Sequence, residues 1–273
     1  MGDSAPYRRD MRTRHFITTV ALLLTIQASH AAAPAEPDAR ALIIEARNLA
    51  YDANYRNDQA GLRAAIAALQ PLAKESSEVG YANYYLSWTY WALAASQYEA
   101  KDVAGAIESG TRAASHARAG LALRPQDPEF YTALINALIV VAVLDRPQFE
   151  KVAAEIRPAR TKALELGANN PRTVMMDAGM LFNNPPERGG GHQKGIDRYL
   201  QALKLFEAEA LEKTTDPLAP RWGHTLAYGW MAPMYLTITP PQKDKARAAA
   251  ETALRMRPDF WYVRERVLPR LRN

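Results

Sequence analysis

The sequence contains no cysteine. This absence excludes a disulfide scaffold, a catalytic thiol and structural zinc held by thiolates, and it also excludes a thioether-linked lipid anchor. Glycine accounts for only 14 of the 273 residues, which argues against a collagen-like chain. The fold must therefore be held together by packing and polar contacts, without cross-links through sulfur.

Long apolar runs are also scarce. The single such run, from Phe16 to Ile26, is far shorter than the roughly 20 residues that a membrane-spanning helix needs. Arg12 and Arg14 precede the run, and the small residues Ser29 and Ala31 follow it. A positive start, a short apolar stretch and a small-residue exit are typical of a secretory signal peptide, which we expect to be cleaved near Ala31.

This interpretation divides the chain into three parts. Residues 1–31 are the expected signal peptide, with either Met1 or Met11 as its start, and 32–38 form a short Ala/Pro-rich leader that we expect to be disordered. Residues 39–273 remain as one folded domain. The expected location is the periplasm or the extracellular space, with no stable membrane insertion after cleavage.

An excess of charge of either sign is missing as well. The formal net charge of the whole chain is +5, and residues 1–31 hold four arginines and two aspartates. The remaining chain has 30 basic and 27 acidic residues, a net charge of +3. This balance predicts neither a nucleic-acid partner nor binding to an anionic membrane surface.

Alanine is abundant, with 50 residues, and it is the strongest helix former. Apolar residues recur at three- and four-residue spacing after residue 38, and no sustained alternation predicts a strand. We therefore expect an all-α protein. Prolines fall mostly between the predicted segments, although three lie inside them and predict kinks or misplaced ends. The expected helices are Ala39–Ala53, Gln59–Lys74, Val79–Tyr98, Val103–Leu123, Pro128–Leu144, Gln148–Leu166, Arg172–Leu181, Lys194–Leu211, Trp222–Ile238, Gln242–Met256 and Phe260–Leu268.

A pattern of small residues recurs at fixed spacing in two of these helices. Each copy has small residues at offsets of four and three, and a proline follows five residues later. Small side chains on the second helix of a hairpin let it pack closely against the first, and proline ends it. The two copies are Ala113, Ala117, Gly120 and Pro125, and Ala246, Ala250, Ala253 and Pro258.

This pattern resembles the tetratricopeptide repeat (TPR), a 34-residue helix–turn–helix unit. In that register Tyr131 and Leu134 match the large apolar positions in the first helix of the next repeat. Trp230 occupies the equivalent position in the last complete repeat. The resemblance covers Tyr81 to Phe260, although Pro233 stands where the family prefers leucine. It implies a right-handed TPR-like solenoid of about five hairpins with a C-terminal capping helix.

The later part of the chain has a second likeness. A Pro-Pro/Gly-Gly-Gly loop precedes one helix, and Pro220-Arg221-Trp222-Gly223 follows it. This stretch resembles exported TPR-like bacterial proteins, among them the periplasmic T-component of TRAP-type transporters. Such components are often lipid-anchored, and the missing cysteine is a departure from that pattern.

Residues that carry chemistry are few. After residue 31 the histidines are His116, His192 and His224, and none stands in a short-spaced metal-ligand pair. Gly195 is followed by Ile196 rather than lysine, so the glycine-rich loop is not a phosphate-binding P-loop. We expect no catalytic site, no metal and no cofactor. A hydrolase centred on His192 and His224 is the weakest alternative, and it requires both to lie beside a carboxylate.

The aromatic residues predict both a core and a groove. A stripe along one helix is interpreted as core: Tyr81, Tyr84, Tyr85, Trp88 and Trp91. The resemblance places another set on the inner surface of the repeats, where such proteins commonly receive a peptide. Asn136 interrupts an apolar stretch, so it must bond a neighbouring helix or face the groove. The groove candidates are Asn83, Tyr90, Thr132, Asn136, Arg172, Met175, Tyr228 and Tyr235.

The sequence thus predicts a non-catalytic protein that binds a protein or peptide segment in its concave groove. The alternative is a periplasmic small-molecule-binding component of a transport system. A closed apolar cavity with a few convergent polar groups would favour this alternative over an open groove.

Overall fold

The computed structural model describes residues 38–213 and 215–272. In this part of the chain 82% of the residues are helical, in eleven helices, and there are no strands, so the predicted all-α class is confirmed. The expected signal peptide and residues 32–37 of the leader lie outside the described residues. Asp38 belongs to the helical domain, because its side chain accepts a hydrogen bond from the backbone N–H of Arg40 at 3.0 Å.

Most helix boundaries agree with the predicted ones to within two or three residues. A three-residue 3₁₀ turn precedes α6, another precedes α8, and a π-helical turn, Val263–Val267, precedes α11. The α-helices are α1 (Ala39–Arg56), α2 (Gln59–Glu75), α3 (Val79–Glu99), α4 (Val103–Leu123), α5 (Pro128–Leu144), α6 (Phe149–Leu166), α7 (Pro171–Asn183), α8 (His192–Leu211), α9 (His224–Thr237), α10 (Lys243–Met256) and α11 (Leu268–Arg272).

Side-chain caps explain where several helices begin. Asp58, Asp102, Asp127 and Asn170 each accept a hydrogen bond from a backbone N–H in the first turn of the following helix, at 2.9–3.1 Å. These bonds satisfy N–H groups that have no partner inside the helix. In α5 and α7 a proline follows the cap, where its fixed φ suits the first turn.

Two sequence expectations about helix ends are corrected. Trp222 was expected to start a helix, but α9 begins at His224, because Gly223 has a φ of 115° that only glycine adopts readily. The prolines at positions 71, 158 and 233 do not mark misplaced ends, because α2, α6 and α9 run through them.

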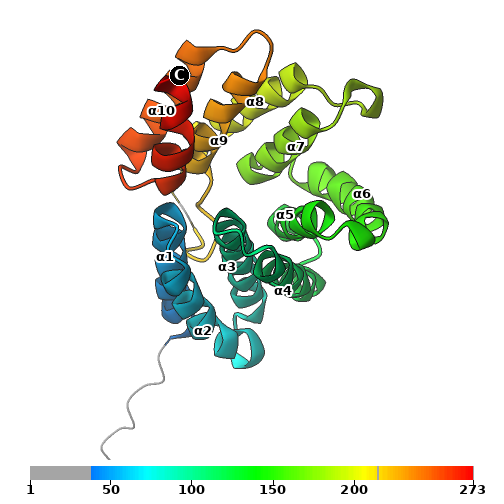
Figure 1. Cartoon of the computed structure of the whole chain (residues 1–273). Coiled ribbons are helices and arrows are strands. Elements are labelled where there is room, and N and C mark those ends of the chain that lie inside the picture. The colour runs from blue at the N-terminus through cyan, green and yellow to red at the C-terminus, as the bar shows by residue number, and fades with distance from the viewer. Residues whose placement is uncertain (1–37, 214, 273) are drawn as a thin grey trace, which may run out of the picture. The chain divides into compact units, whose positions relative to one another are not determined.

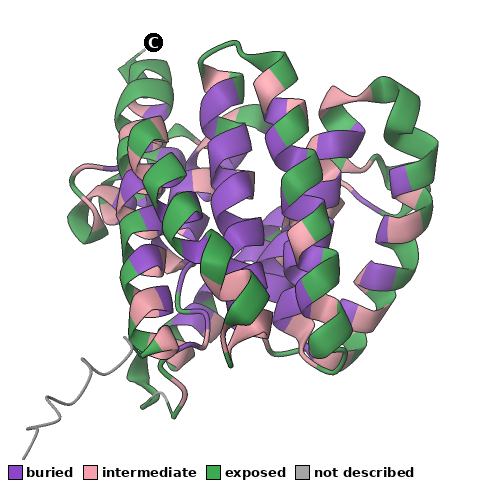
Figure 2. Ribbon diagram, turned by 90° about the horizontal axis from the view of Figure 1, so that it is seen from below, coloured by how far each residue is buried: buried purple, intermediate pink, exposed green. Residues whose placement is uncertain are grey.

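Consecutive helices pack as antiparallel pairs: α1 with α2, α3 with α4, α5 with α6, α7 with α8, and α9 with α10 (Figure 1). The first helix of one pair also contacts the first helix of the next, from α1 to α3, α3 to α5 and α5 to α7. Buried residues gather on the inner helices, and the outer helices carry exposed residues on their outward sides (Figure 2). None of the described helices combines the length and apolar character needed to cross a membrane.

The recurrent small residues lie where helices touch. The five alanines of the two sequence copies are at most 1% exposed: Ala113, Ala117, Ala246, Ala250 and Ala253. Gly120 is equally constrained, since a Cβ on it would lie 2.9 Å from the ring of Phe130. These positions are therefore small because a neighbouring helix occupies the space, as the sequence predicted.

The segment that follows α10 contacts the first helix, α1. Arg257 donates from Nη1 to Oδ1 of Asp52 in α1 at 2.8 Å, and its guanidinium lies over the ring of Tyr55. The Tyr55 ring in turn meets Phe260 edge-on, with 5.1 Å between centroids. The first and last helical pairs are thus joined by polar and aromatic contacts.

The later part of the connection from α8 to α9 is partly buried, with Leu218, Pro220 and Trp222 inside the domain. Residues 215–223, which we call the inner segment, pass beside α1 and α3 (Figure 1). Leu218 is fully buried, and its carbonyl accepts a hydrogen bond from the Tyr85 hydroxyl at 2.6 Å. Asp216 accepts hydrogen bonds from Arg40 and from the Tyr81 hydroxyl at 2.6 and 2.8 Å. The inner segment is therefore held against α1 and α3 by hydrogen bonds.

Candidate functional site

The groove residues predicted on α3 lie inside a helical interface. Asn83 is 5% exposed, and its amide donates to the backbone carbonyls of Ala73 and Val79. The Asn83 carbonyl oxygen lies 2.9 Å from Nδ1 of His116, whose ring stacks on Tyr90. The expectation that Asn83 and Tyr90 face an open groove is wrong, because α2 and α4 cover that side of α3.

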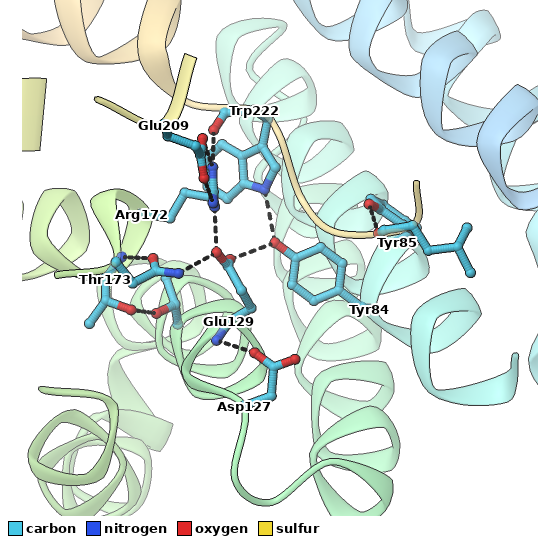
Figure 3. Close-up of polar contacts among 11 residues, drawn as sticks. Tyr84, Tyr85, Asp127, Glu129, Arg172, Thr173, Glu209 and Trp222 are labelled. Atoms are coloured by element: carbon cyan, nitrogen blue, oxygen red, sulfur yellow. Dashed lines mark hydrogen bonds and ion pairs between the residues drawn. The ribbon is translucent and has the colours of Figure 1, made fainter. Parts of the chain in front are cut away.

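Arg172 and Thr173 belong to a buried polar cluster (Figure 3), and Thr132 joins it through the Thr173 hydroxyl. The hydroxyls of Thr132 and Thr173 lie 2.8 Å apart and join α5 to α7. Arg172 donates to the carboxylates of Glu129 and Glu209, and its Nη1 donates to the Trp222 carbonyl at 3.0 Å. Thr132 and Arg172 are thus 1% and 3% exposed, and neither is available to a ligand in the groove as predicted.

The electrostatics of this cluster explain why it can be buried. Burial by itself lowers the pKa of Arg172, but Glu129 and Glu209 more than offset this, so the pKa stays above its ordinary value. Glu129 also accepts hydrogen bonds from the Tyr84 hydroxyl and the Asn170 amide. One cation between two carboxylates, with these further donors, satisfies the buried charges. The cluster is a structural junction of α3, α5, α7, α8 and the inner segment.

The two candidates on α9 are in different surroundings. Tyr235 is 6% exposed, and Lys245 of α10 lies 5.7 Å from its ring centroid. Tyr228 is partly exposed, and its hydroxyl lies 3.4 Å from Oε1 of Glu207 on α8. Tyr235 is therefore a packing residue, and Tyr228 lies at the contact of α9 with α8.

Asn136 and Met175 remain, and both line the same cavity. This cavity has a volume of about 780 Å³ and lies between α5, α6 and α7, with contributions from α8 and α9. Its wall is mainly apolar and includes Ile139, Ile156 and Trp230. Small-molecule sites in proteins typically have volumes of about 300–1,000 Å³ and apolar walls of this kind.

Two polar groups in this wall have no protein partner. The side chain of Asn136 is partly exposed and forms no hydrogen bond with any described residue. Tyr199 is 4% exposed, and its hydroxyl likewise has no partner among the described residues. A Cβ on Gly179 would meet nothing within 4 Å except this hydroxyl, at 3.9 Å. Both groups are therefore available to hydrogen-bond a molecule in the cavity.

The cavity continues along the inner side of α9. A second hollow of about 320 Å³ shares Gly179, Tyr199 and Trp230 with it, and a third of about 230 Å³ shares Trp230. Trp230 thus contributes to all three walls. The sequence placed Trp230 in the repeat pattern, but a core tryptophan and a cavity tryptophan have the same helical spacing, so its role at the site was missed.

Arginine residues complete the wall of the large cavity and were also missed. Arg157 and Arg160 come from α6, and Arg188 comes from the 3₁₀ turn after α7. Isolated arginines on a helix are usually solvated, so no signal in the sequence separates these from the others. The wall of this cavity contains no aspartate or glutamate.

The histidines give no support for hydrolysis. His192 stacks on Phe182, whereas His224 packs against Phe206 and Tyr228. Burial lowers the pKa of His224, and the nearby carboxylates of α8 only partly offset this. Within residues 38–213 and 215–272, no group of three or more His, Asp or Glu side chains could hold a metal ion.

No family model matches the sequence, and no curated protein is significantly similar to it.

Proposed function

We propose that this chain is an exported, TPR-like helical-repeat protein that binds a small, largely apolar molecule in the cavity between α5, α6 and α7, without catalysis. The observation that carries the proposal is the cavity of about 780 Å³, whose apolar wall presents the unpartnered side chains of Asn136 and Tyr199. An apolar pocket with a few convergent polar groups is the usual form of a small-molecule site.

The arrangement of helical pairs supports the repeat part of this proposal. The first helices of the first four pairs contact one another in succession, the fourth and fifth pairs meet through α8 and α9, and buried alanines line the second helices. Successive stacking of helical hairpins is what a tetratricopeptide pattern implies. Export is proposed from the pattern of arginines, apolar residues and small residues before residue 32. Service in a transport system stays a prediction from the sequence.

Binding of an extended peptide receives less support. The inner segment already contacts α1 and α3 on the side where a peptide would dock. Six of the eight predicted groove residues are also buried in helix contacts or in the polar cluster, although Met175 still lines the cavity. A pocket between two helical pairs fits a compact molecule better than an extended chain.

A cavity-filling variant tests the proposal. In the wild-type protein we expect saturable binding of N-phenylnaphthylamine, an uncharged apolar fluorophore that brightens in apolar surroundings. Gly179→Leu projects a side chain into the cavity, and Ala153→Trp does so from the α6 side. Each should weaken binding about 10-fold or more, a free-energy loss of about 1.4 kcal/mol.

Gly179→Ala and Ala154→Leu are the matched controls. The first adds only a methyl group, and the second adds bulk at an exposed position of α6 that is not in the wall. Both should bind the fluorophore like the wild type, and all variants should keep the helix content and the cooperative thermal unfolding of a folded protein. Unchanged binding in folded Gly179→Leu and Ala153→Trp proteins would refute the site.

A further inference from the structure

The wall of the large cavity is positively charged. Three of its residues are arginines and none is acidic, as described above. Arg157 and Arg188 are exposed, and neither guanidinium forms a hydrogen bond or an ion pair with a described residue. An apolar pocket with two unpaired cations is suited to a ligand that carries negative charge.

The third arginine of the wall, Arg160, is paired with a carboxylate, but that carboxylate is shared with a second arginine. Nε of Arg160 donates to Oδ1 of Asp177 at 2.8 Å, and Nε of Arg198 donates to the other oxygen of the same carboxylate at 2.9 Å. Asp177 is buried and has no second carboxylate beside it in this cluster. Two guanidiniums share one carboxylate, so this group of three side chains keeps a net positive charge, and Arg160 places it at the wall of the cavity.

The unpaired polar groups can also donate to an acceptor. Burial raises the pKa of Tyr199, so its phenol keeps the proton and can donate a hydrogen bond. The Asn136 amide has two N–H donors, and arginine has donors only. The ligand that satisfies most of these groups is an acceptor-rich anion with an apolar body.

We infer that the cavity binds an amphipathic organic anion of the carboxylate class, whose charged group is recognised by Arg157 and Arg188 while its apolar part lies against Ile139, Ile156 and Trp230. This inference rests on the proposed function, because it specifies the ligand of the same cavity. The two oxygens of a carboxylate match the planar donors of a guanidinium, so this head group can pair with an arginine through two hydrogen bonds.

Displacement of bound N-phenylnaphthylamine by three ligands of equal chain length tests the inference. Decanoate carries the proposed head group, decanol is uncharged, and decylammonium has the opposite charge. With the wild-type protein, decanoate should displace the fluorophore at a concentration about 10-fold or more below that of decanol. Decylammonium should be the weakest of the three.

The double variant Arg157→Gln/Arg188→Gln should remove most of the advantage of decanoate and leave the affinity for decanol unchanged. The control Arg63→Gln/Arg264→Gln changes the net charge equally, at exposed positions that line no described cavity, and should behave like the wild type. This control separates local recognition from the general field of the protein.

The outcomes separate the two proposals. Displacement by decanol as efficient as by decanoate overturns the anionic ligand but leaves the apolar site intact. An equal loss of decanoate affinity in both double variants also overturns recognition by Arg157 and Arg188. If the fluorophore does not bind the wild-type protein, the proposed function itself fails.

Discussion

At the scale of single residues, Arg172 shows how one side chain can connect distant parts of the chain. It is almost completely buried, contacts the carboxylates of Glu129 and Glu209, and also holds the carbonyl of Trp222. Removing a buried cation leaves its carboxylates without compensation, which is more costly than losing an exposed ion pair. The residue is therefore structural, although its charge and position resemble those of a ligand-binding arginine.

The first prediction concerns this residue. Arg172→Met should lower the free energy of unfolding by about 3–5 kcal/mol, because Glu129 and Glu209 stay buried without their cation. Arg118→Met is the control, since Arg118 pairs with Glu155 at a partly exposed site and its loss should cost about 1 kcal/mol or less. Urea unfolding followed by circular dichroism measures both. Equal losses in the two variants would contradict the structural role of Arg172.

At the scale of helices, two glycines illustrate opposite reasons for having no side chain. Gly120 of α4 lies against Phe130 of α5, where a Cβ would come within 2.9 Å of the ring. Gly179 of α7 faces the cavity, and a Cβ there would meet only the Tyr199 hydroxyl, at 3.9 Å. The first glycine permits close packing of helices, whereas the second keeps the cavity open.

The second prediction follows from this contrast. Gly120→Ala should destabilise the protein by about 1–3 kcal/mol, because the added methyl group overpacks the contact with Phe130. Gly179→Ala should stabilise it by about 0.5–1 kcal/mol, because alanine favours the helix and the methyl group has room. Thermal and urea unfolding of the pair provide the measurement. Stabilisation of both variants would show that local helix propensity, and not packing, dominates at these positions, whereas destabilisation of both would show that position 179 has no room for a methyl group.

At the scale of the whole domain, the inner segment connects helices that are far apart in sequence. Trp222 donates from Nε1 to the Tyr84 hydroxyl at 2.8 Å, and its ring contacts Trp88 and Trp91. The same segment contacts α1 through Arg40, which donates to Asp216, and through Arg47, which donates to the Pro217 carbonyl at 2.7 Å. The described part of the chain is thus stabilised by contacts of the inner segment as well as by contacts between successive helical pairs.

The third prediction tests this role. Trp222→Ala should lower the free energy of unfolding by about 3–5 kcal/mol, since a buried indole and its hydrogen bond are both lost. Trypsin should also cut the variant faster after Lys213 or Arg221, because the inner segment is held less firmly. Trp261→Ala, at a partly exposed position, should be less destabilising and should not accelerate this cleavage. A Trp222 variant as stable and resistant as the wild type would show that the segment is dispensable.

Sequence reasoning predicted the helices and the close contacts between them, because both depend on local patterns. Three- and four-residue spacing defines a helical face, Asp58 and Asn170 cap their own first turns, and the small residues at 113 and 250 mark close contacts. This three- and four-residue spacing could not distinguish residues that are buried in the core from residues that line a groove. Asn83 and Asn136 occur in similar patterns, yet one is enclosed by α2 and α4 and the other lines a cavity.

The sequence by itself determined the helical class, most helix boundaries, the absence of sulfur cross-links and the small residues at helix contacts. Only the tertiary structure decided the path of the inner segment, the place of the cavity and which arginines lack a carboxylate partner. The physical reason is range: propensity, caps and periodicity act within one or two helical turns. Contacts such as those of Arg172 with Glu129 and Trp222 depend on surfaces that meet only when distant helices pack.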